Sequence, residues 1–288
     1  MGGGTWTTSA YTAHSTSTRG FASMDAFLSS SAQDLYRATK LESCLDPHNV
    51  IRECVDSDEH PNTIPVILAL DVTGSMGSAA EAIAKQLNDI MTEIYKNVQD
   101  VEFCIMAIGD MSYDLSPVQA SQFESDIRIA EQLEKVYFER GGGGNQWESY
   151  TAAWYFGLHH TKLDCWNRGK KGIIITMGDE PLNPYLPRSV VNRVFGDNAQ
   201  ADVDTKELYD AVTDKFDIYH IATNDSRTSY RHYANKIADS WGKLLGQHLV
   251  ISDCNNLYKT IAEIVTNSAN SEMIVGGEVK VTNEGISW

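Results

Sequence analysis

The sequence lacks the features that mark membrane, secreted and disulfide-bonded proteins. None of its apolar runs approaches the roughly 20 residues that a helix needs to cross a bilayer. Its first residues show neither the basic segment nor the apolar segment of a secretory signal peptide. The 5 cysteines are odd in number, widely spaced and without a Cys-x-x-Cys pair, which favours reduced thiols. We therefore expect a cytoplasmic protein with no membrane partner.

Basic residues are also scarce. The 288 residues include 23 Lys and Arg against 39 Asp and Glu, a formal net charge of −16. Such a chain repels polyanions, which argues against nucleic acid or an anionic membrane as a general partner. The composition is otherwise that of a soluble globular protein, with 42% hydrophobic residues. This length can bury a substantial core, so one large domain with extensions is as reasonable as two domains.

From residue 64 onward, apolar runs of strand length alternate with segments of helical spacing. A run of β-branched residues bounded by polar or glycine residues indicates a buried strand, and apolar residues at a spacing of three and four indicate an amphipathic helix. This alternation predicts an α/β fold, Rossmann-like and doubly wound, with a mainly parallel sheet flanked by helices. The expected strands are 64–70, 101–108, 117–123 (a short edge strand), 172–177, 217–222 and 248–252. The expected helices are about 83–98, 127–137, 147–158, 188–195, 204–215, 230–241 and 257–264.

This pattern divides the chain into three parts. Residues 1–63 form an N-terminal arm or extension: its first 24 residues are rich in Gly, Ser and Thr and should be ordered only where they dock on another surface. Residues 46–63 resemble a loop. Residues 64–266 form the predicted α/β domain, and residues 267–288 form a tail that alternates weakly and could add a strand or a hairpin.

The end of the first strand carries the most informative residues. Asp71 follows the apolar run directly, and Thr73 and Ser75 follow at alternate positions, with glycines in the turn. In open parallel sheets, ligands bind at the carboxyl ends of the strands. A carboxylate and two hydroxyls are hard oxygen donors that suit Mg²⁺. The alternative is that Thr73 and Ser75 only cap the following helix, but capping does not explain an aspartate at the end of a buried strand.

Two further segments should reach the same edge of the sheet. Asp179 follows the buried strand 172–177, and two carboxylates brought together at strand ends favour a shared cation. The glycine run 141–144 precedes Glu148, which could supply another oxygen, or simply favour the helix dipole; Asn145 could reach the site instead. The run is not a phosphate loop, because no Lys-Ser or Lys-Thr follows it.

The segment DVTGSM after a buried strand resembles the Asp-x-Ser/Thr-x-Ser metal-ion-dependent adhesion site of von Willebrand factor A-type domains. The resemblance extends from about residue 64 to 265. It implies that Asp71, Thr73 and Ser75, in the loop after the first strand (the first loop), are metal ligands. Family members usually supply a threonine ligand from a second loop. The corresponding segment here, GGGGNQWES, resembles the loop of divergent bacterial members, and this resemblance implies that Glu148 takes the role of that ligand. In the family, an aspartate ligand in a third loop normally follows its strand threonine directly. Here Asp179 comes two residues later, and we assign it to that ligand position.

The resemblance implies a non-enzymatic module that binds a protein through Mg²⁺, Mn²⁺ or Ca²⁺, with an Asp or Glu of the partner completing the coordination. Intracellular bacterial or phage members of this kind work in multi-protein assemblies, for example beside an AAA+ ATPase. One alternative is a structural subunit of a phage or another large assembly, with a vestigial site. A Mg²⁺-dependent phosphohydrolase of the haloacid-dehalogenase type is less favoured, because its second aspartate is replaced by Thr73 and no acid for proton transfer is evident.

Overall fold

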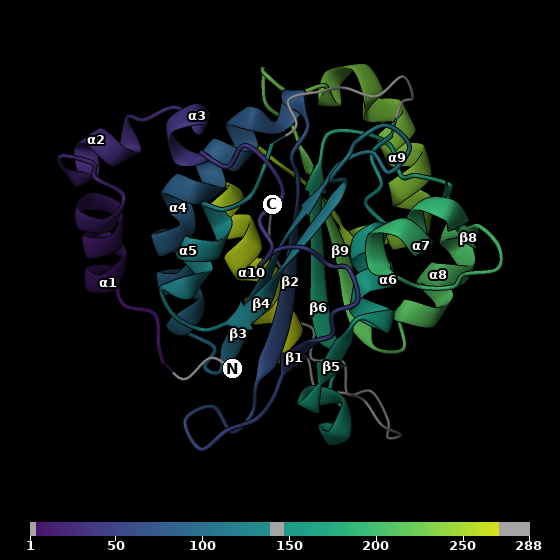
Figure 1. Ribbon diagram of the computed structural model, residues 1–288, viewed down its shortest axis with the longest axis horizontal. Coiled ribbons are helices and arrows are strands. Elements are labelled where there is room, and N and C mark those ends of the chain that lie inside the picture. The colour runs from purple at the N-terminus through teal and green to yellow at the C-terminus, as the bar shows by residue number, and fades with distance from the viewer. Residues whose placement is uncertain (1–3, 139–146, 271–288) are drawn as a thin grey trace, which may run out of the picture.

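A six-stranded sheet forms the centre of the protein (Figure 1). The computed structural model describes residues 4–138 and 147–270. The strand order is β10-β9-β6-β2-β3-β4; the first five are parallel, and β4 runs antiparallel to β3 at the edge. The predicted fold class is confirmed. The strands are β2 (Ile64–Asp71), β3 (Val101–Ile108), β4 (Val118–Glu124), β6 (Gly172–Gly178), β9 (Phe216–Thr223) and β10 (Leu249–Ser252).

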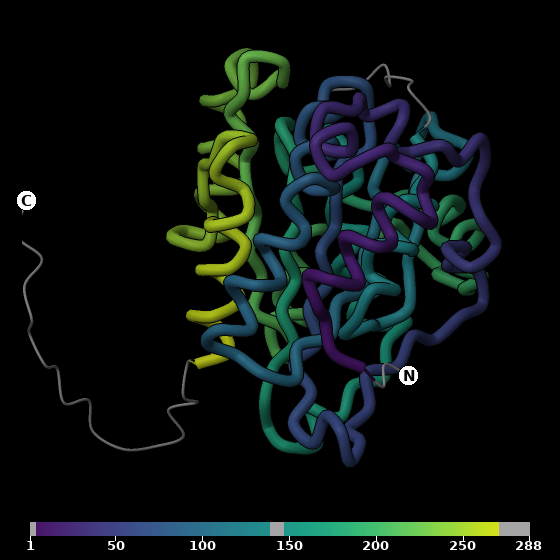
Figure 2. The backbone as a smooth tube through the Cα atoms, turned by 90° about the vertical axis from the view of Figure 1, so that its left-hand side faces the viewer, coloured from purple at the N-terminus to yellow at the C-terminus, as the bar shows by residue number. Residues whose placement is uncertain are grey.

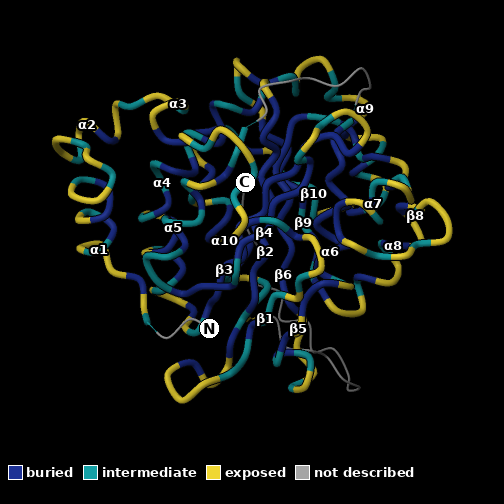
Figure 3. The backbone as a smooth tube through the Cα atoms, viewed as in Figure 1, coloured by how far each residue is buried: buried dark blue, intermediate teal, exposed yellow. Residues whose placement is uncertain are grey.

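Helices cover both faces of this sheet, because β2 and its parallel neighbours are apolar on both sides. Val66, Leu68 and Leu70 pack on one face, and Ile67 and Ala69 on the other. Figure 3 shows the strands as the buried centre of the molecule. The first face is covered by α4 (Gly77–Tyr95), α5 (Arg128–Leu133) and α10 (Leu257–Asn270), and the second by α6 (Ala152–His159), α7 (Arg188–Phe195), α8 (Thr205–Val212) and α9 (Tyr230–Leu245).

Short elements differ from the sequence prediction. The segment 46–63, predicted as a loop, contains strand β1 (Arg52–Cys54), which pairs in parallel with β5 (Thr161–Leu163). Helix α6 begins at Ala152 rather than near residue 147, and α5 ends at Leu133. The remaining elements are the hairpin of β7 (Tyr185–Leu186) and β8 (Val203–Asp204), and the 3₁₀ turns η2 (Gly74–Met76), η3 (Asp164–Arg168) and η4 (Gly246–His248).

We call residues 4–50 the N-terminal strap; its helices lie beside α4 (Figure 2). Its last part runs past β4, where the Leu45 carbonyl accepts the Ala120 N–H, to α7, where the Asn49 N–H donates to the Phe195 carbonyl. The strap contains α1 (Thr8–Ala13), the π-helical turn η1 (His14–Thr18), α2 (Met24–Leu28) and α3 (Ala32–Leu35). Its aromatic residues anchor it: the Tyr11 hydroxyl donates to the Ala84 carbonyl at 2.7 Å, and Trp6 Nε1 donates to Asn88 Oδ1 at 3.2 Å. These side chains belong to the same apolar cluster as α4.

The carboxyl terminus is described only to Asn270, where α10 ends. The rest of the predicted tail, residues 271–288, lies outside the described residues, so the expected strand or hairpin falls there. Over residues 4–138 and 147–270, no helix combines the length and the apolar character needed to cross a membrane.

Candidate metal centre

Two neighbouring parallel strands, β2 and β6, end at the candidate site. Leu70 of β2 is in register with Met177 of β6, so Asp71 at the end of β2 and Asp179 just after β6 reach the same edge. Strand β2 has β6 on one side and β3 on the other, and the helices that follow β2 and precede β6 cover opposite faces. This is the switch point at which doubly wound sheets open a crevice for a ligand.

The first loop directs its hydroxyls toward carboxylates. Asp71 Oδ1 accepts hydrogen bonds from the backbone N–H of Thr73 at 2.9 Å and from Thr73 Oγ1 at 2.6 Å. Ser75 Oγ donates to Asp179 Oδ1 at 3.2 Å. Neither hydroxyl caps a helix: Thr73 precedes η2 without a side-chain cap bond, and the N-cap position of α4 is Met76. The capping interpretation therefore does not describe this loop.

The third loop joins the first loop to helix α9. Asp179 is fully buried, and its Oδ2 accepts the backbone N–H of Ser229, which lies at the start of α9. Its other oxygen faces Ser75. Asp179 is thus fixed in one orientation by two different segments of the chain, with one oxygen turned toward the first loop.

The second loop brings Glu148 to the same region. Glu148 is only 4% exposed, and its Oε2 has no hydrogen-bond partner among the described residues. The loop is held to the end of β3 by Ser149, whose N–H donates to the Gly109 carbonyl at 3.2 Å and whose Oγ accepts the N–H of Met111 at 2.9 Å. Glu148 lies before α6 rather than in its first turn. Asn145, the alternative ligand, lies outside the described residues.

The carboxylates of this edge raise one another's pKa values. Burial is the main cause in each case; the charge of Asp179 adds to it at Asp71, and the charge of Asp71 adds to it at Glu148, whose pKa is raised to about 11. Burial and the same neighbours raise the pKa of Glu180 to about 8. Within the described ranges, no lysine or arginine forms an ion pair with Asp71, Glu148, Asp179 or Glu180. A bound cation would relieve this repulsion.

The donor set fits a hard divalent cation through mixed oxygen ligands. In the described part of the chain, no three His, Cys, Asp or Glu side chains gather as the ligands of one ion. The structure joins two carboxylates to two hydroxyls: Asp71 accepts from Thr73, and Asp179 accepts from Ser75. Glu148 lies near enough for its charge and that of Asp71 to interact, but it does not form a three-carboxylate cluster with Asp71 and Asp179. Oxygen donors of these two kinds are ligands that Mg²⁺ and Ca²⁺ accept.

Two residues at this site were not identified from the sequence. The Tyr150 hydroxyl donates to Asp71 Oδ2 at 2.7 Å, so both oxygens of Asp71 are engaged. Tyr150 lies directly over Gly178, where a Cβ would come within 2.0 Å of its hydroxyl oxygen. Glu180 is the other residue. For Tyr150, the sequence offers one signal: Gly178, immediately before Asp179, allows another side chain to approach the backbone closely. Nothing in the sequence indicates which side chain does so.

No protein-family model matches the chain, and no curated protein sequence matches it. Solved structures of similar fold include the pilus adhesin SpaC from Lactobacillus rhamnosus GG in its open conformation (15% identity, TM-score 0.42, 76% of this chain). The chain spans 31% of that adhesin. Others are the vWF domain of the type V pili tip protein Mfa5 from Porphyromonas gingivalis (12%, TM-score 0.42, 76% of this chain and 98% of that one) and the conserved hypothetical protein BatB from Bacteroides thetaiotaomicron (14%, TM-score 0.44, 72% and 100%). At these identities the likeness is one of fold.

Proposed function

We propose that the protein is a non-enzymatic module that binds another protein through a divalent cation, Mg²⁺ or else Mn²⁺ or Ca²⁺. The cation would be held by Asp71, Thr73 and Ser75 of the first loop, Asp179 of the third loop and Glu148 of the second. The observation that carries the proposal is the hydrogen bond from Ser75 Oγ to Asp179 Oδ1, beside Asp71. It joins two strand ends that are far apart in sequence through side chains that are all hard oxygen donors.

The cation would supply a positive charge at an edge of the sheet that otherwise presents carboxylates. An ion held by side chains on one side keeps positions open on the other, where a carboxylate from the partner would complete the coordination. Because the chain carries a net charge of −16, a protein that offers single acidic contacts suits it better than a polyanion such as nucleic acid. The proposed setting is a cytoplasmic multi-protein assembly of bacterial or phage origin, with an AAA+ ATPase as one kind of partner.

The local bonding of Thr73 argues for binding rather than phosphoryl chemistry. Its hydroxyl donates to Asp71 Oδ1, at the position where a phosphohydrolase of the haloacid-dehalogenase type would place its second aspartate. A hydroxyl has no acidic proton near neutral pH and cannot serve as the general acid which that chemistry needs. Turnover of phosphoesters that is lost in Asp71→Asn would favour the hydrolase instead.

Metal binding by the purified protein tests the proposal. We expect calorimetry with Mg²⁺ and Mn²⁺ to show one site in the wild type and none in Asp71→Ala. Asp253→Ala is the matched control: Asp253 also follows a strand, β10, but its side chain caps the next turn by accepting the N–H groups of Asn255 and Asn256. Absence of binding in the wild type, or equal binding in Asp71→Ala, would overturn the proposed site.

The partner is tested separately. We expect a protein captured by the wild type in Mg²⁺ to be released by EDTA and absent from Asp71→Ala, while Asp253→Ala retains it. If the metal binds and Asp71→Ala still enters its assembly unchanged, the site is vestigial and the structural-subunit alternative is favoured.

A further inference from the structure

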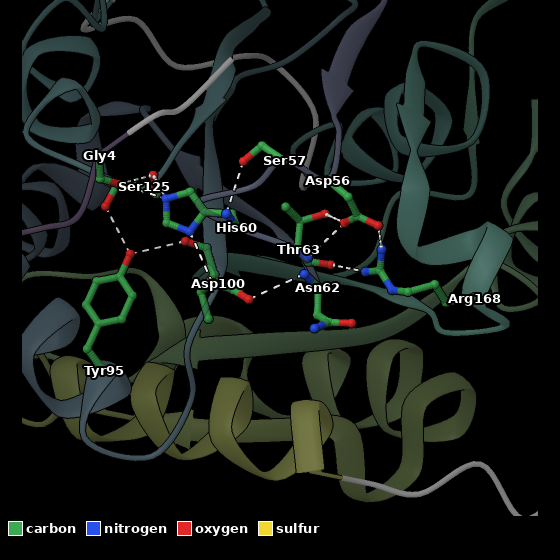
Figure 4. A network of polar contacts seen from close by, with 11 residues as sticks. Gly4, Asp56, Ser57, His60, Asn62, Thr63, Tyr95, Asp100, Ser125 and Arg168 are labelled. Carbon is green, nitrogen blue, oxygen red and sulfur yellow. Dashed lines mark hydrogen bonds and ion pairs between the residues drawn. The ribbon is translucent and has the colours of Figure 1, made fainter.

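Near the start of β2, carboxylates have basic side chains of the protein as partners (Figure 4). Asp56 forms an ion pair with Arg168, and Asp100 Oδ1 lies 3.2 Å from His60 Nδ1. The Asp100 carbonyl also accepts the N–H of Ile64, the first residue of β2, at 2.8 Å. At this end of the strand, the protein itself supplies the groups that balance the acids.

At the other end of β2, the partners of Asp71 are uncharged. Oδ1 accepts from the N–H and the hydroxyl of Thr73, and Oδ2 accepts from the Tyr150 hydroxyl at 2.7 Å. Uncharged donors fix the direction in which a carboxylate points without cancelling its charge. The arrangement therefore holds Asp71 in place and leaves its charge for a cation to balance.

The ring of Tyr150 has no room to turn away from Asp71. Its side chain is fully buried, and it lies against Gly178 so closely that a Cβ at that position would collide with the hydroxyl. The ring also packs edge-on against His220 and Trp241, with centroids 5.2 Å and 5.5 Å away. The hydroxyl is thus fixed on Asp71 Oδ2 by packing on several sides.

The two rings that support Tyr150 are themselves fixed. His220 stacks on Trp241 with centroids 3.7 Å apart, and its Nδ1 lies 2.9 Å from Thr176 Oγ1 in β6. Trp241 Nε1 donates to the Glu180 carbonyl of the third loop at 3.1 Å. The position of the Tyr150 hydroxyl is therefore set by β6, β9, α9 and the third loop, none of which belongs to the first loop that carries Asp71.

We propose that Tyr150 is a positioning residue of the candidate metal centre, which holds Asp71 ready for the cation through the hydrogen bond to Oδ2. This inference rests on the proposed function. Groups that orient a ligating side chain contribute to metal affinity because the site needs no rearrangement when the ion arrives, and their loss costs about 10- to 100-fold in affinity. The opposite role, in which the hydroxyl occupies an oxygen that the cation needs, predicts tighter binding once the hydroxyl is removed.

Tyr150→Phe tests the proposal, because phenylalanine keeps the ring and removes only the donor. We expect calorimetry with Mg²⁺ to give a dissociation constant about 10- to 100-fold higher in this variant than in the wild type. Tyr155→Phe is the matched control: its hydroxyl also donates to an aspartate at 2.7 Å, but that residue, Asp197, pairs with His160 and is no candidate ligand. We expect the control to bind Mg²⁺ as the wild type does.

Unfolding in EDTA tests the contact without metal. Tyr150→Phe and Asp71→Ala remove the same hydrogen bond, so the double variant should lose less of the urea midpoint than the two single losses combined. Tyr155→Phe and Asp71→Ala share no contact, so we expect their losses to add. Additive losses for Tyr150 and Asp71 would overturn the proposal.

The outcomes separate this inference from the proposed function. If the wild type binds Mg²⁺ and Tyr150→Phe binds it equally or more tightly, the positioning role is wrong and the metal site stands. If the wild type binds neither Mg²⁺ nor Mn²⁺, both proposals are overturned.

Discussion

Gly178 decides how closely the ends of β2 and β6 can meet, because Tyr150 occupies the space where its side chain would be. Through this contact the Tyr150 hydroxyl reaches Asp71 Oδ2. We expect Gly178→Ala to lower the free energy of unfolding by about 1–3 kcal/mol, since the ring cannot shift without losing its packing on His220 and Trp241. Urea unfolding measures the change.

The matched control is Gly242→Ala, in the interior of α9. A Cβ there would meet only Leu249 at an ordinary 3.7 Å. Because alanine is a better helix former than glycine, we expect this substitution to stabilise the protein by about 0.5–1 kcal/mol. If Gly242→Ala lowered the free energy of unfolding as much as Gly178→Ala, the Tyr150 contact would not be the cause of the destabilisation.

The placement of Asp71 and Asp179 at one edge of the sheet could be predicted from sequence because each follows a recognisable strand. Asp71 and Asp179 come after apolar runs whose direction places them at one edge. The roles of Tyr150 and Glu180 could not be predicted in this way. Tyr150 looks like one more apolar residue of a helical pattern, and its contact with Asp71 depends on the register of β2 with β6 and on the loop before α6.

Helix α2 depends on tertiary packing for its stability. It has only five residues, too few to be stable alone. Phe27 is 1% exposed and packs edge-on against Tyr11 and Phe21, whereas its neighbour Leu28 is 46% exposed. We expect Phe27→Ala to reduce the free energy of unfolding by about 3–5 kcal/mol and Leu28→Ala by only about 0.5 kcal/mol, measured by urea unfolding. Equal effects would mean that the strap contributes little to stability.

Some elements are determined by local sequence and others by tertiary packing, and this difference explains which elements could be predicted. Strands such as β2 and β6 are almost entirely buried and rich in apolar residues, so local sequence identifies them. The helix α1, with sequence TSAYTA, has no apolar period and forms where Tyr11 docks on α4. The three residues of β1 are too few to show alternation, and their pairing with β5 is set by tertiary contacts.

Across the whole molecule, acidic groups gather at the carboxyl end of the sheet and make stability depend on pH. The pKa of Glu180 is raised from 4.5 to about 8 by burial and by neighbouring carboxylates. The folded protein therefore holds this proton more tightly than the unfolded chain. Its contribution to stability is complete below about pH 4.5 and is lost as pH rises toward about 8.

Mg²⁺ should reverse this trend, because a bound cation favours the ionised carboxylates. We expect urea unfolding to show that Mg²⁺ stabilises the protein more at about pH 8 than at about pH 5, relative to EDTA. At each pH the two samples differ only in the metal, so the difference between Mg²⁺ and EDTA isolates the carboxylates. A Mg²⁺ effect that is the same at both pH values would contradict this picture of the cluster.

In the proposed site, the ends of β2 and β6 hold a divalent cation. The most direct measurement is anomalous diffraction from crystals grown with Mn²⁺. We expect one strong anomalous peak between Asp71, Ser75 and Asp179, which disappears in crystals of Asp71→Ala and persists in Asp253→Ala. A wild-type crystal that shows no peak there, with Ser75 Oγ still bonded to Asp179, would contradict it.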